Sequence, residues 1–328
     1  MERSYKFRIY PTEAQQEQIE KTFGCCRFVY NHYLTERIRA YSENGTQVSR
    51  FEQDRNLPAL KKEAPWLGEV DARALQSVLQ DLDRAYQDYF GRRKKGVEAG
   101  FPKYKSKRER RKSYRTKGTT LKLLAGKVQL PKLDYVECEV SQGIEGRIIA
   151  ATVSRVASGK YYVSLRCTDV GEKAMAKTAR SVEIEVGEHG YIVTSDGKRY
   201  ENHGGLAKTQ KRINRAQREL ARKASGGENR EKARIRLAEL YEKLTNQRND
   251  TLRKLTTEIV RNYDAIRVKN QRARDVVKNC GNVNHVEIIT WYEFVRQLEY
   301  KCRWYGKELV KTEAEGQKVK QSKPAKAE

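Results

Sequence analysis

The chain has 328 residues, enough for roughly two or three domains, and its 68 Lys and Arg against 43 Asp and Glu give a formal net charge of +25. This excess favours a polyanionic partner, and nucleic acid before a membrane, because no apolar run approaches the roughly 20 residues of a spanning helix. The absence of a signal-peptide core, a C-x-x-C pair and an H-x-x-x-H pair argues against secreted and zinc-finger proteins. We expect a soluble cytoplasmic protein that binds nucleic acid.

The N-terminal part predicts a strand and then helices. Residues 4–10 alternate like a strand and stop at Pro11, after which Thr12 can cap a helix that extends to about residue 44, with Gly24 as a candidate break. A loop is expected over residues 56–71. A second helix then starts at about Ala72 and keeps its apolar residues three or four positions apart.

A strongly basic segment follows these helices. Residues 100–118, GFPKYKSKRERRKSYRTKG, contain nine Lys or Arg against one acid, Glu109, with two interleaved tyrosines. Such a segment is either a solvated flexible loop or a contact for nucleic acid. The coincidence of cations for phosphates with aromatic rings for bases favours the second interpretation.

Short alternating stretches between residues 119 and 170 predict a small antiparallel sheet or barrel. The strand at residues 4–10 is expected to complete it, because that strand has no other apparent partner. A turn at residues 157–160 connects two of these strands.

From Ser181 the pattern is α/β. VEIEVGEHGYIVTSDGK at residues 182–198 predicts two strands joined by a tight turn, and residues 205–262 predict two helices that separate at residues 223–229. The first helix has cations around much of its surface, which fits either a solvated face or contact with nucleic acid. A strand at residues 265–268 and a helix from about Thr290 follow, and the polar residues 311–328 predict a disordered tail without a further strand.

Several long stretches, in order from about residue 3 to 310, resemble TnpB, the RNA-guided nuclease of certain bacterial insertion sequences. They include FRIYPTEAQQEQIEKTFGCCRFVYNHYL, LPALKKEAPWL, ALQSVLQDLDRAYQDYF, GFPKYKSK, TVSRVASGKYYVSL and EFVRQLEYKCRWYGKELV. The spread of independent motifs over nearly the whole chain makes the resemblance specific.

The resemblance implies an α+β multidomain fold. It places a small antiparallel wedge β-barrel at residues 1–10 and 113–180, and a helical recognition insert with the basic loop at residues 11–112. An RNase H-like RuvC α/β domain without a zinc ribbon is expected at residues 181–310, followed by the disordered tail at 311–328.

The resemblance also places two metal-ligand positions of the RuvC domain at Glu185 and Lys269. Glutamate displaces the carboxylate by one methylene from the aspartate that is usual in the family, and an ammonium at the second position removes a donor and repels a cation. The zinc ribbon and third acid are missing, and Glu183, Asp196 or Asp264 are poorly placed substitutes. We therefore predict no catalytic residue, no catalytic Mg or Zn, and a chain that is not an enzyme.

In this respect the chain resembles the TnpB-like nuclease-dead repressors (TldR). The resemblance implies a bacterial, cytoplasmic protein that binds one guide RNA as a monomer. The complex is expected to recognise double-stranded DNA next to a short adjacent motif and to associate with the nucleoid when bound. Its occupancy of the DNA then blocks transcription. A residually active RNA-guided DNA endonuclease and a decayed transposon protein that binds only its own RNA are the alternatives.

Residue roles follow from chemistry and spacing. Gln76 and Gln80 lie one helical turn apart, with Arg73 nearby, and we predict that these three read the adjacent motif, although surface Gln residues are often without function. Predicted contacts with the nucleic-acid backbone are cations of the basic segment and of the first helix after residue 205: Lys103, Lys105, Lys107, Arg110, Arg111, Arg115, Lys211, Arg212, Arg215 and Arg218.

Overall fold

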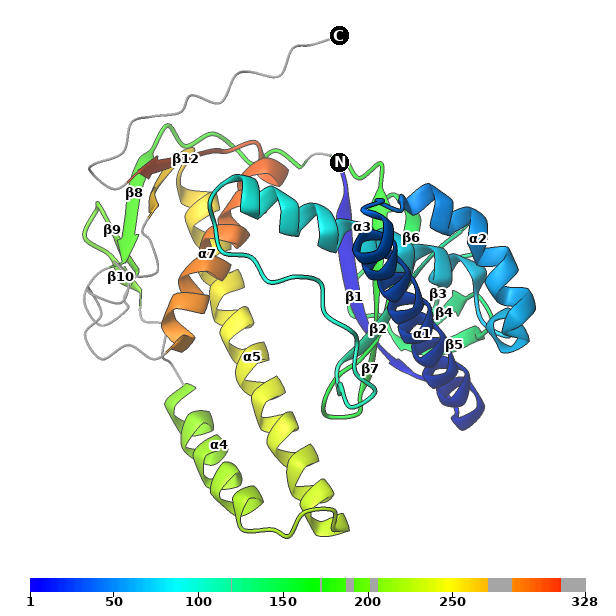
Figure 1. Cartoon of the computed structure of the whole chain (residues 1–328). Helices are drawn as coiled ribbons and strands as arrows, with labels where there is room; N and C mark the ends of the chain where they lie inside the picture. Colours follow the sequence, from blue (N-terminus) through cyan, green and yellow to red (C-terminus); the bar gives the residue numbers. More distant parts are fainter. Residues whose placement is uncertain (119, 172, 187–191, 201–205, 271–284, 314–328) are drawn as a thin grey trace. The chain divides into compact units, whose positions relative to one another are not determined.

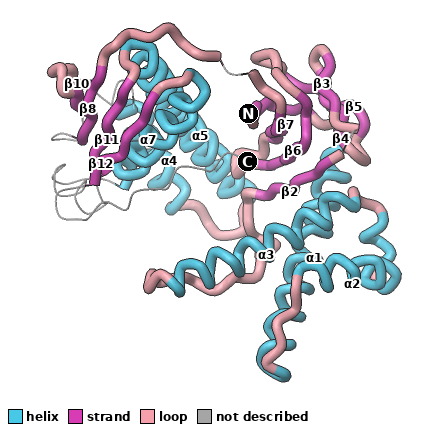
Figure 2. Tube along the Cα trace, turned by 90° about the horizontal axis from the view of Figure 1, so that it is seen from above, coloured by secondary structure: helices cyan, strands magenta, loops and turns pink. Residues whose placement is uncertain are grey.

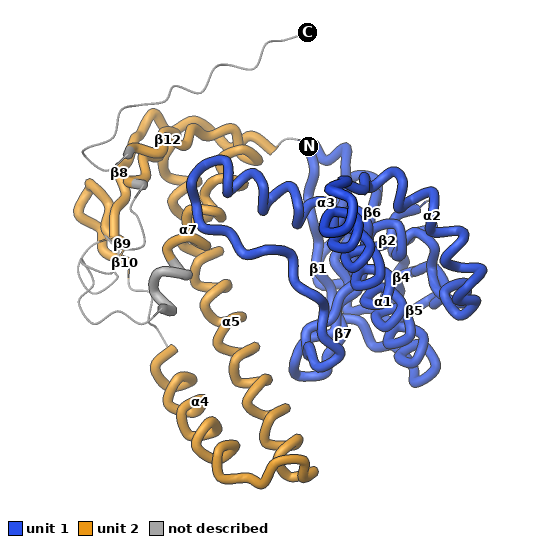
Figure 3. Tube along the Cα trace, viewed as in Figure 1, with its two compact units in different colours: residues 1–171 blue, residues 172–328 orange. Residues whose placement is uncertain are grey.

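Two units of mixed α and β structure make up the chain in the computed structural model (Figures 1 and 3). Unit 1 is Met1–Gly171 and unit 2 is Glu172–Glu328. The structure describes residues 1–118, 120–171, 173–186, 192–200, 206–270 and 285–313. Within these ranges no helix combines the length and the apolar character needed to cross a membrane.

Unit 1 contains a seven-stranded antiparallel sheet (Figure 2). The strand order is β2-β6-β7-β1-β5-β4-β3. The strands are β1 (Arg3–Tyr10), β2 (Lys112–Lys117), β3 (Lys122–Leu124), β4 (Lys127–Leu130), β5 (Asp134–Glu139), β6 (Arg147–Arg155) and β7 (Tyr161–Thr168). Strand β1 pairs with both β5 and β7, which confirms that it joins the later strands. Its alternate residues Tyr5, Phe7 and Ile9 are buried, as one side of a strand facing a core should be.

The expected closed barrel is not found. In the described residues β2 and β3 are the two edges of the sheet and do not pair with each other. Closure requires hydrogen bonds between the first and last strands, and the three-residue β3 forms its ladder with β4. The sheet is therefore open.

Three α-helices and one short 3-10 helix accompany this sheet: α1 (Glu13–Asn44), α2 (Arg50–Glu63), η1 (Pro65–Gly68) and α3 (Ala72–Lys94). Thr12 caps α1 as predicted, but the helix continues through Gly24 without a break. The prediction of a loop over residues 56–71 is wrong for residues 56–63, which are helical. They belong to α2, which starts at a capping box formed by Ser49 and Glu52. Burial of Leu57 and Leu60 then maintains the helix despite an internal proline.

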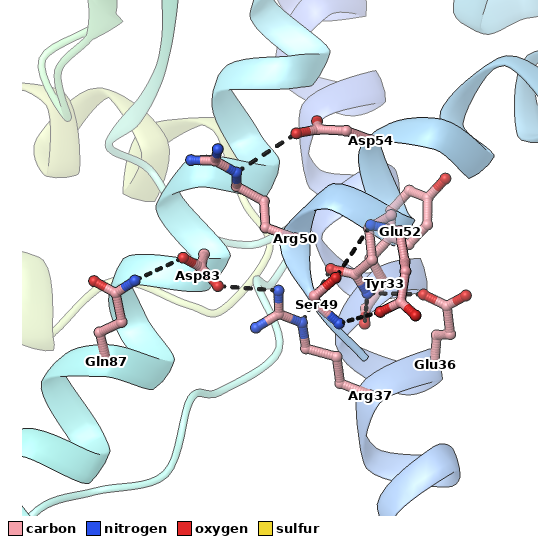
Figure 4. A network of polar contacts seen from close by, with 10 residues as sticks. Tyr33, Glu36, Arg37, Ser49, Arg50, Glu52, Asp54, Asp83 and Gln87 are labelled. Carbon is pink, nitrogen blue, oxygen red and sulfur yellow. Dashed lines mark hydrogen bonds and ion pairs between the residues drawn. The ribbon is translucent and has the colours of Figure 1, made fainter. Parts of the chain in front are cut away.

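A buried polar network joins the three α-helices (Figure 4). The side chain of Gln53 on α2 is fully buried and donates to the carbonyl oxygen of Tyr33 at 3.0 Å and to the Glu36 carboxylate at 2.7 Å. Arg37 Nε donates to Gln53 Oε1 at 3.0 Å, and its Nη2 donates to Asp83 Oδ1 on α3 at 3.2 Å. Because these polar groups are hydrogen-bonded to one another, the network fixes how the three helices pack.

Unit 2 contains a mixed five-stranded sheet of order β10-β9-β8-β11-β12. The strands β8 (Ser181–Val186), β9 (Ile192–Thr194) and β10 (Arg199–Tyr200) are antiparallel, whereas β11 (Ala265–Asn270) is parallel to β8 and to β12 (Glu308–Glu313). This mixed sheet is consistent with the RuvC-like domain that the resemblance implies.

Strand β12 corrects the prediction that residues 311–328 form a tail without a strand. It pairs in parallel with β11 along its whole length, and Leu309 packs against the core of the unit. Residues 314–328 lie outside the described residues.

The helices of unit 2 among the described residues are α4 (Leu206–Ala221), α5 (Glu228–Asn262) and α7 (His285–Tyr305). The predicted separation of the first two is confirmed, since α4 ends before residue 223 and α5 begins at residue 228. Helices α5 and α7 cover one face of the sheet (Figure 2), where Ile184, Ile266, Ile259 and Phe294 are fully buried.

Candidate nucleic-acid interface

The basic segment of unit 1 is held against helix α1. Asn31 Nδ2 donates to the carbonyl oxygen of Lys105 at 3.0 Å, and the Lys105 amide donates to Asn31 Oδ1 at 2.8 Å. The hydroxyls of Tyr104 and Thr35 are 3.1 Å apart, and Lys105 Nζ lies 4.2 Å from the centre of the Tyr30 ring. These contacts hold the segment in place around residue 105. The interpretation of this part as a freely flexible loop therefore does not fit the structure.

Most predicted cations of this segment are exposed and available to a ligand. In the described ranges the side chains of Lys103, Lys107, Arg110 and Arg111 are exposed and make no hydrogen bond or ion pair. Arg115 differs, because it lies on β2 and its Nη2 is 2.8 Å from Asp81 Oδ1 on α3. An arginine already paired with a carboxylate contributes less charge to a phosphate, so Arg115 is the weakest of these candidates.

The predicted motif readers lie together along α3. Arg73 Nη1 donates to Gln76 Oε1 at 3.3 Å, and Gln80 Oε1 accepts from Lys117 Nζ on β2 at 3.3 Å. Sequence reasoning missed Lys117 in this group. The only signal was its place at the end of the basic run, because the pairing of a β2 residue with α3 depends on tertiary packing. That these residues read an adjacent motif stays a prediction.

The four α4 cations predicted to contact nucleic acid lie on the side of the helix away from its buried residues, a narrower distribution than the expected one around much of the surface. Lys211, Arg212, Arg215 and Arg218 are all exposed. The opposite side buries Leu206, Ile213 and Ala216 in a cluster with residues of α5, along which α4 packs (Figure 1). Spacings of three and four residues place side chains on the same face. The arrangement is a concentrated cationic surface suited to a row of phosphates.

The two positions that the resemblance assigns to metal ligands, Glu185 and Lys269, lie on neighbouring parallel strands of unit 2. Ile184 of β8 is in register with Val268 of β11, so the following residues are also adjacent. Lys269 Nζ lies 3.1 Å from Glu185 Oε2, and the two side chains are 41% and 48% exposed. The structure thus brings together the two positions that the resemblance assigns to metal ligands.

The described residues here do not fit a two-metal centre. A divalent cation bound to Glu185 would have to displace an ammonium group that already neutralises the carboxylate, and Lys269 supplies no oxygen. Within the described ranges, no group of three or more His, Cys, Asp or Glu residues is arranged to hold a metal ion.

Two carboxylates considered as substitute ligands have structural partners. Asp264 accepts hydrogen bonds from the amides of Thr178 at 2.7 Å and Ala179 at 2.6 Å and forms an ion pair with Lys307. The hydrogen bond from Lys307, aided by those amides, lowers the pKa of Asp264 to about 2. Asp196 accepts from Thr194 Oγ1 at 2.5 Å and from the hydroxyl of Tyr263, and these bonds lower its pKa. Both acids therefore support the fold.

Replacing Lys269 with glutamate should create a divalent-cation site. The substitution removes the ammonium and places a second carboxylate beside Glu185 on the adjacent strand, so Mn²⁺ binding by isothermal titration calorimetry should tighten by about tenfold or more. Lys269→Gln is the matched control, because it removes the charge without adding a carboxylate. Equal Mn²⁺ affinities for the two variants would show that the strands hold these side chains too far apart.

Comparison with known proteins identifies relatives over nearly the whole chain. Residues 1–46 match the helix-turn-helix domain, and residues 167–279 the "Probable transposase" domain, of the IS605 OrfB proteins. A protein of Streptomyces pristinaespiralis named "Putative RNA-guided DNA endonuclease" is 34% identical over 94% of this chain and 77% of its own length. "Putative RNA-guided DNA endonuclease InsQ" of Escherichia coli (strain K12) is 29% identical over 94% of this chain and 79% of its own.

One solved structure, "Cryo-EM structure of the Cas12f1-sgRNA-target DNA complex", aligns with 95% of this chain and 89% of its own chain. The sequence identity is 13% and the TM-score 0.44, which is too low to support an argument about function.

These relatives contradict the prediction that the chain is not an enzyme, since both are named as endonucleases. That prediction depended on a few acidic positions, whereas the similarity to the Streptomyces protein extends over 94% of the chain. The chain belongs to the TnpB family, the IS605 OrfB family of transposon-encoded proteins.

Proposed function

We propose that this chain is an RNA-guided DNA-binding protein. The observation that carries the proposal is the pair of cationic surfaces, the basic segment and the exposed face of α4. Within the described residues, these of their cations make no hydrogen bond or ion pair: Lys103, Lys107, Arg110, Arg111, Lys211, Arg212 and Arg215. Unneutralised cations on ordered backbone bind phosphates by releasing counterions from the nucleic acid. The relatives named as RNA-guided DNA endonucleases support guide RNA and DNA as the two partners.

In this proposal base pairing reads the target, and the protein supplies backbone charge and recognition of a short adjacent motif. One monomer binds one guide RNA. The α3 residues Arg73, Gln76 and Gln80 read the motif in duplex DNA, since glutamine can form paired hydrogen bonds with adenine in the major groove. The basic segment and α4 hold phosphates of the guide and of the DNA.

We propose further that occupancy of a promoter by this complex represses transcription. A bound complex blocks the passage of polymerase through its position on the duplex, and this effect requires tight binding alone. The guide sequence determines which gene is affected, because the protein reads only the adjacent motif.

RNA-guided cleavage of DNA is the second candidate function. The names of the two relatives favour it. Binding with cleavage and binding without cleavage predict the same occupancy and differ only in the fate of the bound DNA.

One experiment separates these outcomes. The full chain is purified from its host, the RNA that accompanies it is sequenced, and its DNA occupancy is mapped. A structured RNA whose guide matches the occupied DNA supports the proposal, whereas random RNA contradicts it. Incubation of the complex with matched DNA in Mg²⁺ then measures cleavage, and the transcript level of an occupied gene measures repression.

Replacing Gln76 and Gln80 with alanine should change the preference among adjacent motifs. Loss of a paired hydrogen bond to a base costs about 1 to 3 kcal/mol of discrimination, so the preferred motif should lose roughly 5- to 150-fold of its advantage in a randomised-motif binding assay. Arg110→Ala is the matched control, because losing a phosphate contact weakens binding to every motif alike. An unchanged motif preference in the glutamine variant would exclude these residues as readers.

A further inference from the structure

A cavity of about 380 Å³ in unit 1 opens between helix α1 and the basic segment. Phe23, Gly24 and Arg27 of α1 form one side, and Lys105, Lys107 and Arg111 of the segment line the other. The volume is within the range of roughly 300 to 1,000 Å³ that is usual for small-molecule sites, which is more than a single phosphate needs.

The lining of this cavity is strongly cationic. Lys112 also lines it, but Glu20 neutralises that lysine at 2.7 Å and contacts Arg155 at 2.9 Å. In the described residues, by contrast, the side chains of Arg27, Lys107 and Arg111 form no hydrogen bond or ion pair. Glu109 also lines the cavity, so two carboxylates stand against five Lys and Arg side chains, and the remaining positive charge favours an anionic ligand.

The position of the basic wall is fixed before any ligand arrives. The reciprocal hydrogen bonds between Asn31 and the backbone of Lys105 attach the segment to α1 one helical turn beyond Arg27. A ligand that binds here does not have to order the loop, so less of its binding energy is lost to conformational entropy.

Gly24 shapes one wall of this cavity. It lies in the interior of α1, where glycine is less favourable than alanine. Apart from its chain neighbours and the nearby backbone of its own helix, a Cβ atom built at this position meets no atom within 4 Å, so packing within the described protein does not require glycine. Gly24 lines the cavity together with Phe23, and its missing side chain leaves that part of the wall open.

We propose that this cavity holds one nucleotide of a nucleic-acid strand. Its phosphate lies against Arg27, Lys107 and Arg111, and its base or sugar lies over the bare backbone at Gly24 and the edge of Phe23. This assignment rests on the proposed function and adds a specific nucleotide site to it. A strand of RNA and a strand of DNA offer the same chemistry, and separate probes distinguish them.

The test uses the full chain with two fluorescein-labelled probes, a 20-nucleotide single-stranded RNA and a DNA of the same sequence, in fluorescence anisotropy titrations. Gly24→Leu fills the cavity and should weaken binding of at least one probe by about tenfold or more, and Arg27→Gln should weaken the same probe and reduce its salt dependence. If the variants lose affinity for the RNA probe alone, the nucleotide belongs to RNA, and if they lose affinity for the DNA probe alone, it belongs to DNA. Lost affinity for both probes indicates a site that accepts either strand.

Gly24→Ala keeps the test valid if the leucine variant does not fold. Alanine favours the helix, so the thermal midpoint should rise by about 2 to 4 °C while affinity falls. Gly91 is the matched control, because it is also a glycine of an α-helix with nothing within 4 Å of an added Cβ and is not among the cavity residues. Gly91→Ala and Gly91→Leu should leave affinity unchanged.

Failure of the proposed function and failure of the nucleotide site give different results. If the unaltered protein binds neither probe, the proposed function fails. If it binds tightly, but folded Gly24→Ala and Arg27→Gln bind both probes as well as it does, the cavity is not a nucleotide site and the proposed function stands.

Discussion

Replacing Arg37 with methionine should lower the free energy of unfolding of unit 1 by about 3 kcal/mol. Arg37 is 9% exposed, and its guanidinium bonds Gln53 at 3.0 Å and Asp83 at 3.2 Å. Methionine retains the apolar stem but leaves the buried Gln53 oxygen without its donor and the Asp83 carboxylate without its cation. Urea unfolding of the full chain, followed by intrinsic fluorescence, measures the change.

The effect should be specific to the network. Arg39→Met is the matched control, because Arg39 is an exposed arginine of the same helix whose side chain makes no hydrogen bond or ion pair in the described residues. That variant should stay within about 0.5 kcal/mol of the unaltered protein. Equal unfolding midpoints for the two variants would mean that the network contributes little to stability.

The second large effect is expected on α4. Replacing Lys211, Arg212 and Arg215 together with glutamine should reduce the slope of log K against log salt by about 2 to 3, because each lost phosphate contact removes about 0.7 to 0.9 from it. Affinity for guide RNA or for DNA at low salt should fall by at least about tenfold, without a change in sequence preference. Filter binding at several salt concentrations measures both quantities.

A matched triple variant separates the α4 surface from net charge. Lys232, Arg236 and Lys243 are exposed cations of α5, and their replacement by glutamine lowers the net charge by the same three units. This control should lose less affinity and keep most of the salt slope. Equal losses for the two triple variants would show that binding follows overall charge and does not depend on the α4 face.

Sequence reasoning succeeded where the signal is local. The start of α3 at Ala72, the cap at Thr12 and the separation of α4 from α5 follow from side chains only a few residues apart. It failed at α2, where a loop was expected over residues 56–71, because the capping box at Ser49 and burial of Leu57 together outweigh the interior Pro58.

The candidate sites were predicted less completely than the helices. The cations of the basic segment and α4 were identified by composition, but their confinement to one face of α4 became clear only when the buried side, with Ile213, was known. The cavity beside Gly24 was not predicted at all, because Gly24 and Lys107 are far apart in the chain.

By itself the sequence determined the basic character, the periodic helices and strands, and membership of the TnpB family, since charge, short-range periodicity and long motifs are all visible along the chain. Only the tertiary structure decided which strands are neighbours and that the unit 1 sheet is open. It also decided that Lys269 pairs with Glu185 and that the basic segment closes a cavity against α1. The physical reason is that strand pairing, ion pairs and cavities depend on contacts between residues distant in sequence, and local patterns do not encode those distances.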